Sequence, residues 1–136
     1  GDTTGSTPSN VMDYITIAST GNATDFGDLT VARYGVGGSS NSTRGIFSGG
    51  WSGANSDVLD YITIATTGDA TDFGNLSVGR RSTDSSSDGT TSVFGGGYGS
   101  GYETTIDYVT ISTLGNATDF GDLTVGRQGV AATSGD

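Results

Sequence analysis

One thirteen-residue segment occurs three times in this chain, and this repetition limits the possible folds more than any other feature. The copies are GNATDFGDLTVAR (21–33), GDATDFGNLSVGR (68–80) and GNATDFGDLTVGR (115–127), each 47 residues after the last. A fixed period of this length is typical of repeat proteins. An active site is normally built once, so the repeated Asp-Phe-Gly indicates architecture rather than catalysis. We expect one repeat domain over residues 1–136, with units of approximately 1–47, 48–94 and 95–136, the last incomplete.

Each unit has the pattern of several short β-strands. The most apolar segments are rich in Ile, Val, Tyr and Thr, which suit a pleated sheet, and they carry apolar residues on both faces. They are VMDYITIAS (11–19), VLDYITIAT (58–66) and TIDYVTIST (105–113). RGIFSGG and TSVFGGG predict a second strand that ends in glycine turns. TDFGDL predicts a weak outer strand, and GVGGSS or GVAATS (129–134) predicts a strand of small residues. No segment shows helical periodicity with caps. Four antiparallel strands per unit predict an all-β fold built of β-propeller blades.

The order of a glycine pair, Asp-Tyr, an aromatic residue, Leu and Arg resembles the kelch repeat of kelch-like β-propellers. The matching residues are Gly49–Gly50, Gly96–Gly97, Tyr61, Tyr108, Arg33, Arg80 and Arg127. The tryptophan expected on the outer strand is replaced by Phe26, Phe73 and Phe120, which indicates a side branch. The segment DYITIASTGNATDFGDLTVAR is also similar to repeats in virion structural proteins of marine and cyanobacterial phages. These resemblances imply a non-enzymatic structural or adhesive module of a virion or another extracellular assembly.

The composition excludes several other classes of protein. Fifteen acidic residues stand against five arginines, with no lysine or histidine, for a net charge of −10. Such a surface repels phosphate backbones, so we expect neither nucleic-acid binding nor attachment to anionic membranes, and no apolar run is long enough to span a bilayer. Without His or Cys there is no paired nucleophile and base. We expect no enzymatic activity and no cofactor, with a hydrolase using paired aspartates as the remaining enzymatic alternative.

The acidic residues around each Asp-Phe-Gly have two interpretations. Calcium binds oxygen ligands in Asp- and Asn-rich loops, but the spacing lacks the alternating ligand set of an EF-hand. Asn and Asp also stabilise turns by accepting hydrogen bonds from nearby backbone amides. We favour turn chemistry and expect no metal site; a kinase-type Asp-Phe-Gly is excluded because the chain has no lysine to bind phosphate. The residues concerned are Asp25, Asp28, Asp72, Asn75, Asp119 and Asp122.

The three repeated arginines, Arg33, Arg80 and Arg127, could form an anion-binding ring or a structural contact. We favour the structural interpretation because these residues repeat with the scaffold. In it, each guanidinium makes charge-assisted hydrogen bonds to a repeated carboxylate and ties one blade to the next. The carboxylates expected in this role are Asp25, Asp72 and Asp119.

Two glycine-rich loops, SGGWSGAN and GGGYGSGY, differ between units and carry the aromatic residues Trp51, Tyr98 and Tyr102. Aromatic rings combine an apolar face with a polar group. They could therefore stack on sugar rings or pack between blades, and the sequence leaves both open. The first interpretation gives the alternative function, a carbohydrate-binding, lectin-like propeller.

Three complete units of 47 residues need five more positions than the 136 present, and the absent positions correspond to residues 43–47 and 90–94, one strand. Propeller rings hold 4–8 blades, so three units do not close a ring. We expect self-association of two chains to complete six blades, or further blades in a longer chain. An isolated trio should expose an apolar face at each end, lined by Tyr14, Ile15 and Ile17 and their equivalents.

Overall fold

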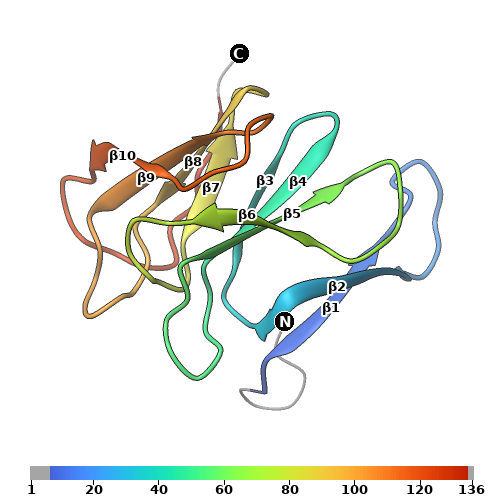
Figure 1. Cartoon of the computed structure of the whole chain (residues 1–136), viewed down its shortest axis with the longest axis horizontal. Helices are drawn as coiled ribbons and strands as arrows, with labels where there is room; N and C mark the ends of the chain where they lie inside the picture. The colour runs from blue at the N-terminus through green and yellow to red at the C-terminus, as the bar shows by residue number, and fades with distance from the viewer. Residues whose placement is uncertain (1–6, 135–136) are drawn as a thin grey trace.

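The computed structural model describes residues 7–134 and contains, in that range, ten β-strands and no helix. The strands form three antiparallel sheets, which lie side by side in chain order from blue to red in Figure 1. The predicted all-β fold is therefore confirmed. The first sheet consists of β1 (Ser9–Tyr14) and β2 (Thr24–Arg33). The second consists of β3 (Gly37–Ser40), β4 (Arg44–Ser48), β5 (Val58–Thr63) and β6 (Thr71–Asn75), and the third of β7 (Asp84–Ser87), β8 (Thr91–Gly95), β9 (Thr105–Thr110) and β10 (Thr118–Asp122).

The two four-stranded sheets have the same construction. Each is a meander in which successive strands pair, and equivalent residues share one register: Phe47 lies opposite Asp60, and Phe94 opposite Asp107. The sheets are offset from the sequence units, because β3 and β4 come from the first unit and β5 and β6 from the second. As predicted, the Asp-Phe-Gly strands β6 and β10 are outer strands, each at one edge of its sheet. Strands β3 and β7 lie at the opposite edges.

The first sheet is a hairpin that corresponds to β5–β6 alone. Strand β1 stops at Tyr14, whereas β5 continues to Thr63, where it pairs with Arg44 of β4. The hairpin has no strand equivalent to β4 among the described residues, so the segment after Tyr14 lacks a pairing partner. The prediction that GVAATS forms a strand is wrong for the same reason: residues 129–134 form no strand, because no strand in the described part of the chain pairs with them.

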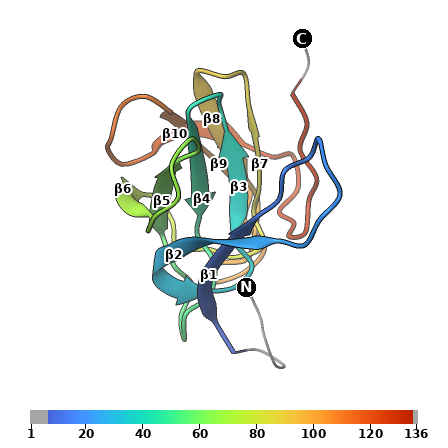
Figure 2. The same ribbon diagram turned by 90° about the vertical axis from the view of Figure 1, so that its right-hand side faces the viewer.

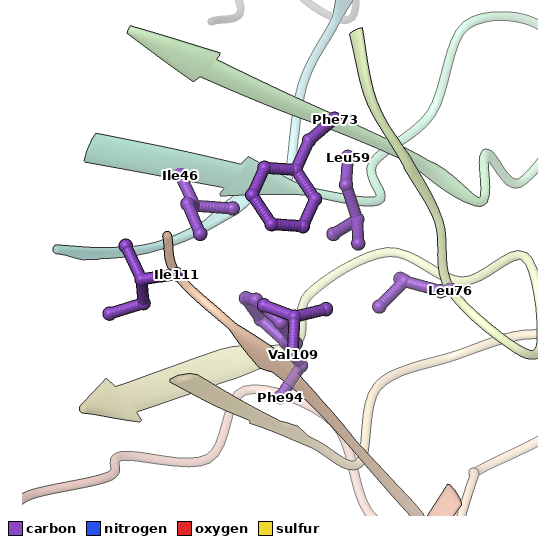
Figure 3. Packing of buried hydrophobic residues seen from close by; sticks show 7 residues of the cluster. All are labelled: Ile46, Leu59, Phe73, Leu76, Phe94, Val109 and Ile111. Atoms are coloured by element: carbon purple, nitrogen blue, oxygen red, sulfur yellow. The ribbon is translucent and has the colours of Figure 1, made fainter. Parts of the chain in front are cut away.

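The largest apolar cluster lies between the second and third sheets. Figure 3 shows Ile46, Leu59, Phe73 and Leu76 facing Phe94, Val109 and Ile111 across this space. A second cluster joins the hairpin to the second sheet, with Met12, Phe26, Leu29 and Ala70 at its centre. The second sheet is therefore covered on both faces, which explains why its strands are apolar on both faces. Burying each large aliphatic or aromatic side chain contributes roughly 1.5–3 kcal/mol.

Strands β3 and β7 run next to each other along the inner edges of their sheets (Figure 2). Space is limited there, and Gly37 shows the reason for the small residues. A Cβ on Gly37 would lie 2.7–2.9 Å from the side-chain oxygens of Thr83, Ser48 and Ser85. Even a methyl group at this position would therefore push β3 away from the neighbouring side chains.

Candidate functional site

Buried ion pairs join the successive units. At the first junction Arg33, the last residue of β2, places Nη2 2.9 Å from a carboxylate oxygen of Asp60 in β5. At the second, Nη1 of Arg80 lies 2.8 Å from Asp107 in β9. All four side chains are fully buried. Charges without solvent contact need close partners of opposite sign, so each pair fixes one unit against the next.

Further hydrogen bonds complete the environment of each buried carboxylate. Asp60 accepts from the backbone N–H of Thr30 at 3.2 Å and from its hydroxyl at 2.6 Å. Asp107 accepts the same two bonds from Ser77, at 3.1 and 2.6 Å. Burial lowers the pKa of Arg33 below its ordinary value, and the charge of Asp60 opposes that shift. Because both members of each pair are buried and in contact, these arginines make structural contacts rather than an open anion site.

The prediction that the repeated carboxylates of the Asp-Phe-Gly segments bind these arginines is wrong. Asp25, Asp72 and Asp119 are exposed and form no ion pair with these arginines. The carboxylate of Asp25 accepts a hydrogen bond from the N–H of Gly27 at 3.2 Å, and Asp119 accepts one from Gly121 at 3.1 Å. Asp25 and Asp119 therefore bind backbone amides locally, at the β-bulges of β2 and β10. The sequence held a signal for the true partners, because Asp60 and Asp107 also repeat and interrupt otherwise apolar strands.

Arg127 occupies the position of Arg33 and Arg80 in the last unit, but it is exposed. Its Nε donates to the carbonyl of Val125 at 3.2 Å. No carboxylate within residues 7–134 forms an ion pair with it. The same part of the chain contains no cluster of three or more acidic residues able to hold a metal ion.

The three aromatic residues singled out from the sequence lie together around Arg81. The guanidinium carbon of Arg81 is 4.9 Å from the ring centroid of Trp51 and 4.7 Å from that of Tyr98. Tyr98 in turn meets Tyr102 edge to face, with centroids 5.6 Å apart. A cation over an aromatic face is attracted by the ring quadrupole, so Arg81 holds two loops from neighbouring units together.

Asn55 fixes the position of Arg81. Its side-chain oxygen accepts a 2.8 Å hydrogen bond from Nη1 of Arg81, and its amide donates to the carbonyl of Gly99 at 2.6 Å. We call the set Trp51, Asn55, Arg81, Tyr98 and Tyr102 the aromatic site. Sequence reasoning missed Arg81. The available signal was that it breaks the repeat, since its equivalents are Tyr34 and Gln128.

The rings of the aromatic site differ in accessibility. Trp51 and Tyr98 are half-buried and have Arg81 over one face. Backbone bridges from Tyr34 to Trp51 and from Arg81 to Tyr98 also tie both loops to the preceding unit. Tyr102 remains 64% exposed. The site can therefore present one open ring, a half-buried cation and several polar groups to a ligand.

No protein-family model matches the chain, and a search of curated proteins gives no match. Within the described residues, no helix has the length and apolar character needed to cross a membrane.

Proposed function

We propose that the three sheets are blades of a kelch-like β-propeller and that the chain is a non-enzymatic structural or adhesive module. The observation that carries this proposal is the repeated junction, in which Arg33–Asp60 and Arg80–Asp107 make one buried contact twice. In repeat proteins, contacts between neighbouring units supply much of the stability. The adjacent inner strands β3 and β7 also suit blades arranged around an axis.

The proposed setting is a virion or another extracellular assembly, and it rests on the resemblance of the repeat to phage virion repeats. Antibodies against this chain should label assembled particles from its source in immuno-electron microscopy. Label restricted to material inside cells would overturn the proposed setting. Hydrolysis of model glycosides by the purified chain would overturn the proposal that the module is non-enzymatic.

The second candidate function is carbohydrate binding, and the exposed ring of Tyr102, next to the Tyr98 ring that Arg81 covers, favours it. Sugar rings stack on aromatic faces, and the hydroxyl and guanidinium groups nearby can bond sugar hydroxyls. A glycan array of the wild-type chain and of Tyr102→Ala and Tyr102→Phe separates the two functions. Binding that Ala removes and Phe retains would establish the lectin function, whereas no reproducible binding by the wild-type chain would exclude it.

A further inference from the structure

We propose that a second copy of this chain binds head-to-tail, through the two faces that the terminal sheets leave open. The first, the hairpin face, consists of Asp13, Ile15, Ile17 and residues 21–23. The second, the distal face, consists of residues 120–124 and Arg127. This inference names the partner of the proposed structural module and rests on that proposal.

The two internal junctions provide the template, because they use one set of backbone hydrogen bonds. At the first junction Gly68 N–H donates to the Phe26 carbonyl at 2.7 Å, and Ala70 N–H to Asp28 at 2.8 Å. At the second, Gly115 donates to Phe73 at 2.9 Å and Ala117 to Asn75 at 2.8 Å. The equivalent donors Gly21 and Ala23 lie on the hairpin face, and the equivalent acceptors Phe120 and Asp122 lie at the distal face.

The charges of the two faces are complementary. Asp13 occupies the position of Asp60 and Asp107, and it is exposed. Arg127 occupies the position of Arg33 and Arg80 and is also exposed. Thr124 stands where Thr30 and Ser77 donate to the buried carboxylate. Each face therefore carries one half of the contact that closes both internal junctions.

The apolar residues show the same complementarity. Phe73 is 2% exposed inside a junction, whereas its equivalent Phe120 is 64% exposed on the distal face. Ile111 is fully buried, whereas its equivalent Ile17 is 95% exposed on the hairpin face. Exposed apolar patches of this kind are typical of interaction surfaces.

A hollow of about 450 Å³ opens beside Arg127, with Val93, Ile106 and Leu123 among its lining residues. These three are the equivalents of Ile46, Leu59 and Leu76. In the second sheet those residues pack against Val109 and Ile111 of the next unit (Figure 3). The hollow therefore has the position and lining to receive Ile15 and Ile17 of the second copy.

Gly121 also lacks the close neighbour that its equivalents in the other two units have. Gly27 and Gly74 have φ of 141° and 146°, and a Cβ on either would collide with the backbone of Gly68 or Gly115 in the following unit. Gly121 has φ of 142°, yet nothing lies within 4 Å of its Cβ position. The backbone is thus shaped for a close approach that no described residue makes.

Because the two faces differ, the contact is heterologous, and it closes a ring or continues as a filament. Two copies supply six units, within the 4–8 blades of known propeller rings. The proposed assembly is therefore a two-copy ring.

Sedimentation velocity over a micromolar concentration series tests this proposal. We expect the wild-type chain to sediment as two copies, and Asp13→Arg and Arg127→Asp each to sediment as a monomer, because each variant places like charges in contact. An equimolar mixture of the two variants restores opposite charges at both contacts and should restore the dimer. Asp69→Asn is the matched control; it also removes one carboxylate, but Asn22 and Asn116 occupy the equivalent positions, so the dimer should persist.

A wild-type chain that stays monomeric, with an intact β-sheet circular dichroism spectrum, would overturn the proposal. So would charge-reversal variants that associate as strongly as the wild type, or a mixture no better than its components. If the chain is monomeric, the two faces would instead be contact surfaces for further repeats of a longer protein. The proposed structural function is tested independently of this dimer, by the particle-labelling and glycan experiments.

Discussion

Arg80 donates a 2.8 Å hydrogen bond to the carboxylate of Asp107, and both side chains are completely buried. Removing one partner leaves an uncompensated charge in the interior. We therefore expect Asp107→Ala to lower the free energy of unfolding by about 3–5 kcal/mol, measured by urea denaturation. Asp72→Ala is the control, because Asp72 is exposed; its cost should stay within about 0.5 kcal/mol. Equal losses in the two variants would contradict the assignment of Asp107 as the partner.

Replacing both members of the pair should cost less than removing one. In the double variant Arg80→Met/Asp107→Leu no buried charge remains, and apolar side chains fill most of the volume. We expect its free energy of unfolding to exceed that of Asp107→Ala by at least about 1 kcal/mol. A double variant less stable than the single one would show that the hydrogen bonds of Ser77 and Phe94 to this pair matter more than its charges.

The identity of these pairs explains how far the sequence can predict this fold. A period of 47 residues and β-rich segments were sufficient for the all-β fold, because both signals are local or repetitive. The partner of each arginine was not predictable in the same way. Arg33 and Asp60 lie in different units, and the period shows that both positions recur without showing which of them meet.

The aromatic site shows a second limit of sequence reasoning. Trp51, Tyr98 and Tyr102 were recognisable by type and loop context, and they do lie together. Arg81 was missed because it is not a repeated position, and the period of 47 residues points only to residues that recur. The strand predicted for 129–134 failed for a related reason, since strand formation depends on a neighbour that local propensity does not reveal.

The glycines of the Asp-Phe-Gly strands should differ in their tolerance of alanine. Gly74→Ala introduces both backbone strain at positive φ and a collision with Gly115. Gly121→Ala introduces the same strain but meets open space. Strain at such positions costs of order 1–3 kcal/mol, so Gly121→Ala should lose about that amount in urea denaturation and Gly74→Ala more. Equal losses, measured at a concentration where the chain is monomeric, would contradict the close approach of Gly74 to the next unit.

Trp51 is the single tryptophan, so its fluorescence reports on the aromatic site. Arg81→Ala removes the cation over its ring, which at such sites is worth about 0.5–2 kcal/mol, and opens the ring to water. We expect an emission maximum at longer wavelength. Arg44→Ala is the matched control, because it removes a similar contact, 4.8 Å from the ring of Tyr61, away from Trp51. An unchanged spectrum in Arg81→Ala, or an equal shift in Arg44→Ala, would count against the stacking described.

Calcium should not change the stability of the chain. The carboxylates of Asp25 and Asp119 accept hydrogen bonds from backbone amides two residues later, a role that needs no ion. A ligand that binds only the native state must raise its stability. Thermal unfolding in excess chelator and in millimolar calcium should therefore give the same midpoint. A rise of several degrees with calcium would reveal a metal site and overturn the turn interpretation.

Acid should weaken one particular turn, between β7 and β8. The carboxylate of Asp88 accepts hydrogen bonds from the N–H groups of Thr91 at 2.7 Å and Thr90 at 2.8 Å, and these bonds lower its pKa below the ordinary value. Because the folded-state pKa is the lower one, the contribution of Asp88 to stability is complete above the unfolded pKa of about 3.9. It is lost as the pH falls through the folded-state value. Asn41 accepts the equivalent bonds from Thr43 and Arg44, both at 2.8 Å, without a titrating group.

Asp88→Asn should therefore fold, since Asn41 shows that an amide fits this turn. We expect the wild type to be more stable than Asp88→Asn at neutral pH, because a charged acceptor makes the stronger hydrogen bond. The difference should shrink as the pH falls below about 4, measured by urea denaturation of both proteins across that range. Asn41→Asp provides the reciprocal test, because it should gain the acid sensitivity that Asp88→Asn loses. A difference that stays constant through the acid range in both comparisons would show that the Asp88 carboxylate contributes nothing through its charge.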